Sequence, residues 1–256
     1  MTSIGGRAPA WGGRSLAVLA IVLLALNLRT GVAVISPIVR SISEDIPLTS
    51  VGIGLLGMLP PLAFAASGFF APLVARRVGL EMSIVLACGA MAVGPVIRAL
   101  APSYAILLVG SVVLLAGKGF GNILLPPVIK RYFPDRIGTM TAVYATLMAV
   151  GASLPILAAA PLALASGWRF SIGIWGIAAV VAALPWMLLW RDRRREARAA
   201  IVGDVVETPA PEIVGRMAHS RVAWAIALAF MLTSFNVYAL FAWLPEIIAD
   251  LTGAPS

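Results

Sequence analysis

Residues 137–168 read IGTMTAVYATLMAVGASLPILAAAPLALASGW and contain no charged side chain over 32 positions. A helix needs about 20 apolar residues to cross the roughly 30 Å hydrocarbon core of a bilayer. The run is continuous and lacks the apolar–polar alternation of a membrane β-barrel strand. This stretch therefore predicts a transmembrane helix, and it directs the interpretation of the rest of the chain.

Similar apolar runs lie on both sides of it in a chain of 256 residues, of which 61% are hydrophobic and 12% are charged. A soluble domain carries about 25% charged residues, so the composition excludes an ordinary soluble globule and a disordered chain. We expect an all-α integral membrane protein with a six-helix bundle and a seventh transmembrane helix. The runs predict spans at residues 16–39, 52–74, 82–100, 105–127, 139–161, 168–190 and 222–244.

Basic residues are distributed unevenly between the two sides of these spans. With the N-terminus in the cytoplasm, 14 of the 19 Lys and Arg residues lie inside and three outside. Because basic loops stay in the cytoplasm, this split predicts a multi-pass membrane protein with its N-terminus inside. The expected parts are a cytoplasmic N-terminus (1–15), a six-helix unit (16–190), an Arg-rich cytoplasmic linker (191–221) and a final segment with helix seven (222–256).

Several function classes lack the residues that they need. The chain has one cysteine, Cys88, and one histidine, His219, so neither a disulfide nor a His/Cys metal site is expected. No nucleophile–base set or carboxylate pair lies in the spans, which argues against an enzyme, and no cofactor is expected. The net charge of +8 comes from clusters between apolar runs, which face solvent or lipid headgroups and do not indicate nucleic-acid binding. Gly52, Gly54 and Gly57 spell GxGxxG, but the motif follows no strand and opens a membrane helix.

Two cations lie where a charge is costly. Arg29 is near the middle of the first span and Lys118 near the middle of the fourth, where an ionised side chain costs about 2.5–3.5 kcal/mol on insertion scales. None of the 11 acidic residues falls within a predicted span. A bound anion would supply the counter-charge; the alternative is that both cations bond to backbone carbonyls or to water.

The helical neighbours of these cations favour a polar cavity. Ser111, Lys118 and Asn122 form one stripe at helical spacing, and Tyr144 in the fifth span could face the same cavity or simply pack there. Arg98, near the outer end of the third span, is expected to extend its side chain to the membrane surface. Asn27 lies about 200° from Arg29 around the first helix, so we expect it to contact a neighbouring helix. The candidate substrate-binding residues are Arg29, Lys118, Asn122 and Tyr144.

Five segments carry a resemblance to a known family. The chain resembles the cyanate permease and 2-nitroimidazole transporter family of the major facilitator superfamily. The span-one and span-four motifs are the more specific ones, and the match runs through nearly the whole chain. The matching segments are Leu26–Arg29, Leu73–Glu81, Gly119–Pro126 with Lys130–Pro134, Gly167–Arg169 and Ala242–Pro245.

The resemblance implies a secondary transporter with a small-molecule or anionic substrate, built in the superfamily from 12 spans. It also implies a location in the plasma membrane, the bacterial inner membrane. It implies cyanate-like anions for one branch of the family and 2-nitroimidazole-like drugs, by export, for the other. Two positions depart from the usual loop after span two, where Arg76 replaces an acidic residue and Pro72 a glycine. Because the seven spans stop at Ser256, we expect a partial chain, completed by a missing C-terminal half or else a truncated fragment without transport.

Overall fold

The computed structural model describes residues 14–31, 34–35 and 38–202, together with 220–222, 224–225, 228–229 and 231–233. The chain divides into two compact units, Met1–Ala199 and Ala200–Ser256. In the second unit the described positions between 221 and 233 are helical. Most of the predicted seventh span lies outside the described residues.

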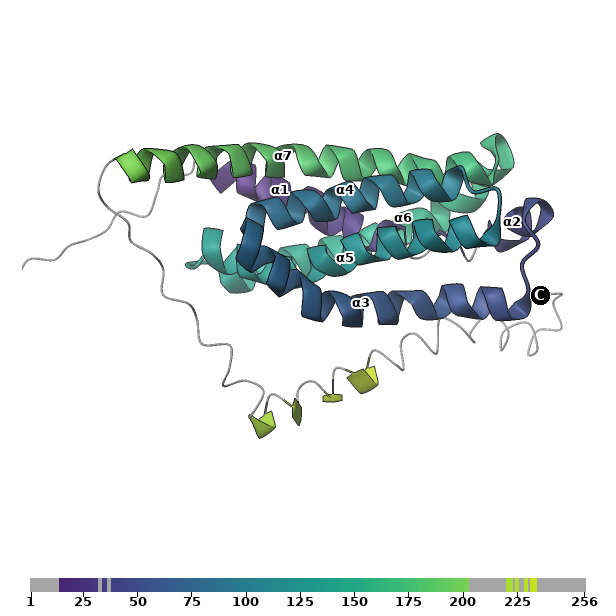
Figure 1. The fold of residues 1–256 in the computed structure, drawn as a ribbon, viewed down its shortest axis with the longest axis horizontal. Helices are drawn as coiled ribbons and strands as arrows, with labels where there is room; N and C mark the ends of the chain where they lie inside the picture. Colours follow the sequence, from purple (N-terminus) through teal and green to yellow (C-terminus); the bar gives the residue numbers. More distant parts are fainter. Residues whose placement is uncertain are drawn as a thin grey trace, which may run out of the picture. The chain divides into compact units, whose positions relative to one another are not determined.

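The described part of the chain is built from α-helices and contains no strand, as expected for a membrane helical bundle (Figure 1). Five of these helices are long and apolar enough to cross a membrane. The helices are α1 (Arg14–Thr30), α2 (Val39–Asp45), α3 (Ser50–Val78), α4 (Leu80–Ala99), α5 (Tyr104–Tyr132), α6 (Ile137–Ser166) and α7 (Trp168–Val202).

The first helix is shorter than the sequence predicts. A span over 16–39 was expected, but α1 ends at Thr30, after 17 residues, and a separate seven-residue helix, α2, follows from Val39. The apolar run continues past the break, so hydropathy gives no sign of it. At this place the carbonyl of Asn27 accepts a hydrogen bond from Lys118 of α5, and that of Gly31, just after the helix, accepts one from Arg98 of α4. These bonds allow the helix to end inside the bundle.

The last long helix extends further than predicted. The sixth span was expected to end at residue 190, whereas α7 continues to Val202 and includes the start of the Arg-rich segment. Arg194 stacks over the Trp190 ring at 4.9 Å, and Arg193 pairs with Glu196 at 3.4 Å, three residues along the helix. These contacts and the good helix propensity of Arg, Glu and Ala support the additional turns.

Helix α5 lies at the centre of the packing within the first unit. It packs most extensively against α4 and α3 and also touches α1 and α6, while α1 pairs mainly with α6 (Figure 1). Large apolar side chains cover the outside, with Leu164 87% exposed and Phe69 77% exposed. A surface of this kind is stable in lipid and not in water, in agreement with a membrane protein.

Two glycines let helices follow each other directly. Gly79 has a φ of 88° between α3 and α4, and Gly167 has a φ of 83° between α6 and α7. This left-handed region is strained for residues with a Cβ. Each glycine therefore reverses the chain direction in a single residue and fixes the hairpins that bring the helices side by side.

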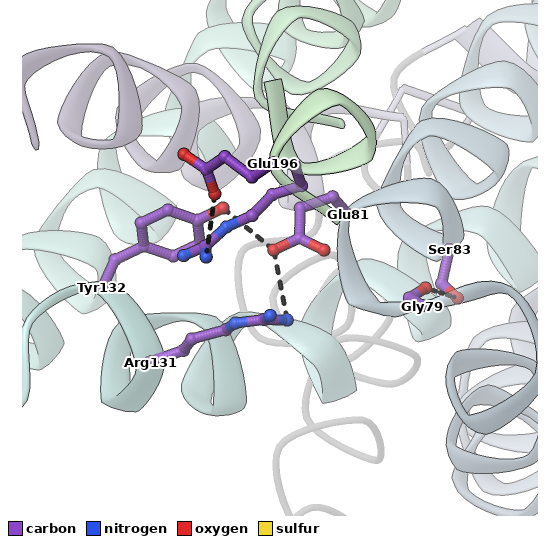
Figure 2. Close-up of polar contacts among 7 residues, drawn as sticks. Gly79, Glu81, Ser83, Arg131, Tyr132 and Glu196 are labelled. Atoms are coloured by element: carbon purple, nitrogen blue, oxygen red, sulfur yellow. Dashed lines mark hydrogen bonds and ion pairs between the residues drawn. The ribbon is translucent and has the colours of Figure 1, made fainter. Parts of the chain in front are cut away.

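Polar contacts join the helices at both ends of the bundle. At one end, which we call the basic end, Glu81 at the start of α4 accepts a hydrogen bond from Tyr132 at 2.9 Å and pairs with Arg131 at 3.3 Å (Figure 2). At the opposite end, Asp45 of α2 accepts a bond from the Trp168 indole at 2.9 Å and pairs with Arg169 at 3.3 Å. These contacts tie the ends of α4, α5, α7 and α2 into one unit.

Candidate substrate-binding site

Lys118 lies in the interior of the bundle, where α5 packs against α1. Its side chain is fully buried, and its ammonium group donates to the carbonyl oxygen of Asn27 at 2.5 Å and to Thr30 Oγ1 at 3.4 Å. The Thr30 hydroxyl in turn donates to the Asn27 carbonyl at 2.9 Å. The sequence left open whether Lys118 binds an anion or bonds to backbone carbonyls and water. Its described contacts are to a backbone carbonyl and a threonine hydroxyl. The negative end of the α1 dipole also favours a cation at this place.

Arg98 is a second buried cation, which the sequence interpretation missed. The expectation that it would extend to the membrane surface is wrong: its side chain is only 2% exposed and donates to the carbonyl oxygen of Gly31 at 3.2 Å. A Cβ at Gly110 on α5 would lie 2.7 Å from Arg98 Cγ, so the missing side chain there makes room for the arginine stem. The glycine opposite is the one sequence signal that could have predicted this burial.

Arg29 has a different environment from the two buried cations. It is partly exposed, and within the described residues it makes no hydrogen bond or ion pair. It lies about 200° around α1 from Asn27, on the opposite face of the helix. Lys118 contacts the Asn27 face, so the structure places the two predicted cations on different sides of the same helix.

The other predicted residues occupy the neighbouring helices. Asn122 on α5 and Tyr144 on α6 are partly exposed, and Tyr144 packs against the apolar core beside α1. Neither makes a hydrogen bond within the described part of the chain. Ser111, by contrast, is buried and donates to the Leu107 carbonyl of its own helix at 2.8 Å. The predicted polar stripe therefore faces packed helices at Ser111 and Lys118 and is accessible only at Asn122.

The described part of the chain offers no second candidate site for a substrate or a metal ion. Within the described residues there is no group of three or more His, Cys, Asp or Glu side chains that could hold a metal ion. A hollow of about 290 Å³ lies at the basic end, lined by Trp190, Arg191, Arg194 and Arg195 of α7. It is open, formed by one helix surface and remote from Lys118, so it is a surface feature and not part of the candidate site.

A membrane bundle of helices with basic groups at its centre is typical of a transport protein. The model of the Major Facilitator Superfamily matches residues 17–255. The chain therefore belongs to this superfamily, whose members are membrane transporters of small molecules and not enzymes.

Three relatives of the chain carry names of individual transporters. The 2-nitroimidazole transporter of Escherichia coli is 31% identical over 252 residues, which are 96% of this chain and 60% of that protein. An uncharacterized transporter of Bacillus subtilis, YycB, is 30% identical over 89% of this chain and 54% of its own length. The cyanate transport protein CynX of E. coli is 26% identical over 91% and 58%. The chain thus spans somewhat more than half the length of these relatives.

Proposed function

We propose that the whole protein is a secondary transporter of a small anion, cyanate-like in size and charge, across the bacterial inner membrane with its N-terminus in the cytoplasm. The observation that supports the substrate charge is the set of basic groups inside the bundle. Lys118 and Arg98 are buried, Arg29 is partly exposed, and no described ion pair links any of them to a carboxylate. Uncompensated positive charge in a membrane protein favours an anionic ligand.

In this proposal Arg29 makes the direct contact with the anion. Of the three cations, it is the one that is partly exposed and has no described protein partner. A guanidinium can donate two parallel hydrogen bonds to one anion, which a lysine cannot. Lys118 contributes through its charge, held in place by the end of α1. Asn122 and Tyr144, which are partly exposed on α5 and α6, would supply polar contacts from the other walls.

A second candidate substrate is a neutral or weakly polar drug similar to 2-nitroimidazole, moved outward. It is favoured by the higher identity to the 2-nitroimidazole transporter, 31% over 96% of the chain, than to the cyanate transport protein, 26% over 91%. The two proposals differ in the charge of the ligand. They also differ in the role of Arg29, which a neutral ligand does not need as a counter-charge.

A binding titration with purified protein in lipid nanodiscs distinguishes the two. Sodium cyanate and 2-nitroimidazole are titrated against the parent and against Arg29→Gln, with Arg40→Gln on the exposed surface of α2 as the matched control. If cyanate is the substrate type, Arg29→Gln weakens its binding by about 10- to 150-fold, the value of one charge-assisted hydrogen bond. Arg40→Gln should bind as the parent does.

Two results would contradict the anion proposal. One is cyanate binding that is equally strong in Arg29→Gln and in the parent. The other is 2-nitroimidazole binding to the parent that is tighter than cyanate binding and insensitive to Arg29→Gln, which would favour the drug transporter instead.

A further inference from the structure

Unpartnered donors are present in the bundle interior. Four buried side-chain atoms in the described part of the chain have no hydrogen-bond partner: Asn27 Nδ2, Arg98 Nε, Arg98 Nη2 and Trp175 Nε1. All four are N–H donors, and none is an acceptor. A buried donor without a partner costs about 1–3 kcal/mol, so such groups are normally satisfied by protein, water or a ligand.

Three of these donors belong to residues around the end of α1. Asn27, Thr30 and Gly31 are spaced three and four residues apart, which places them on one face of that helix. Lys118 bonds to Asn27 and Thr30 on this face, and Arg98 bonds to Gly31. Asn27 and Arg98 are 3% and 2% exposed. Asn27 and the Gly31 carbonyl that holds Arg98 are therefore about one helical turn apart on the same face of the chain.

The charges around this place are all of one sign. Arg98 and Lys118 both bond to α1, at the carbonyls of Gly31 and Asn27, and no described ion pair brings a carboxylate to either of them or to Arg29. Backbone carbonyls satisfy one hydrogen bond of each buried cation but do not neutralise its charge. Two neighbouring cations in a low-dielectric interior repel each other unless an anion lies between them.

We propose that the end of α1 holds one small monovalent anion, bound by the free donors of Arg98 and Asn27 and by the charge of Lys118. An acceptor-only ligand fits because the unsatisfied groups are donors. It must be small because the helices approach closely: a Cβ at Gly31 would lie 2.8 Å from Leu114 Cδ2 and 3.2 Å from Lys118 Cε. The site is on the Asn27 face of α1, separate from Arg29, and does not depend on which substrate is transported.

Thermal unfolding of the purified chain in nanodiscs tests the site. Sodium nitrate or chloride replaces sodium gluconate at constant ionic strength, because gluconate is too large for the space. The unfolding temperature should rise with nitrate and saturate. Arg98→Lys keeps the charge but removes both free guanidinium donors, so the apparent nitrate affinity should fall by about 10- to 150-fold. Arg40→Gln, on the exposed surface of α2, should keep the effect.

Asn27→Asp provides a second test if Arg98→Lys folds poorly. The new carboxylate would lie beside Arg98 and Lys118 and take the place of the anion. This variant should show no response to nitrate, and in gluconate it should be as stable as the nitrate-saturated parent. Absence of any nitrate effect in the parent would overturn the proposal and leave water as the partner of these donors. A nitrate effect lost in Arg29→Gln but kept in Asn27→Asp would also overturn it, while supporting Arg29 as an anion contact.

Discussion

The hydroxyl of Tyr132 donates to Glu81 Oε1 at 2.9 Å and joins the last turn of α5 to the first turn of α4. Glu81 is buried, with its side chain 6% exposed, and Arg131 pairs with the same oxygen (Figure 2). Arg193 of α7 stacks on the Tyr132 ring at 5.3 Å. A carboxylate is therefore present at the basic end, although the last turn of α3 has Arg76 where the family resemblance implies an acidic residue.

Removing the Glu81 carboxylate should destabilise the bundle more than removing a single hydrogen bond. Glu81→Ala leaves the Tyr132 hydroxyl and Arg131 without their partner, and we expect a loss of about 1–3 kcal/mol, reduced from the fully buried case because Arg131 is half exposed. Tyr132→Phe should cost about 1 kcal/mol. The free energies of unfolding of both variants are measured by thermal or denaturant unfolding in detergent. Glu196→Ala, at an exposed pair on α7, is the control and should change little.

The contact between α1 and α6 depends on a glycine. A Cβ at Gly151 would overlap the carbonyl oxygen of Leu26, which belongs to the backbone of α1 and cannot turn aside. Gly151→Ala should therefore separate the two helices and lower stability by about 1–3 kcal/mol, as overpacking does. Gly68→Ala, on the exposed side of α3 with no neighbour within 4 Å, should be neutral or slightly stabilising. Equal unfolding temperatures for the two variants would show that the helices do not pack as described.

Stability at low pH should depend on Asp135 in the connection between α5 and α6. A hydrogen bond from its own backbone, followed by the hydrogen bond and charge of Arg14, holds the pKa of Asp135 below its ordinary value of 3.8. The pair thus stabilises the fold above that value and loses its effect as the pH falls through the lowered pKa. Unfolding temperatures measured from pH 6 to pH 3 should decline less in Asp135→Asn than in the parent. A steeper decline in the variant would contradict this assignment.

Cysteine labelling tests which end of the bundle faces the cytoplasm. In a Cys88→Ala background, Glu44→Cys on α2 and Asp192→Cys on α7 introduce thiols at exposed positions at opposite ends. In intact bacterial cells an impermeant maleimide should label position 44 and not position 192, while inverted vesicles should give the opposite result. Labelling of position 192 in intact cells would reverse the orientation proposed from the basic residues.

The sequence predicted the long spans well because uncharged runs long enough to cross a bilayer seldom form anything other than a transmembrane helix. It failed where tertiary contacts decide the outcome. The end of α1 at Thr30 depends on Lys118 and Arg98, which are distant in sequence and satisfy the carbonyls of Asn27 and Gly31. A hydropathy analysis does not detect such hydrogen bonds. The cations inside the bundle could be predicted only in part: Arg29 and Lys118 are recognisable as charges in spans, whereas the burial of Arg98 depends on Gly110 of the next helix.

The seam between α4 and α5 has a mechanical consequence. Cβ atoms at Gly94, Gly110 and Gly117 would each lie less than 3 Å from the facing helix, at three successive levels along its length. Two helices packed this closely cannot slide or rotate against each other, because any displacement would make a side chain of one overlap the backbone of the other. We therefore expect α4 and α5 to move as one rigid body in any conformational change of the bundle, with relative motion confined to the helix contacts around them.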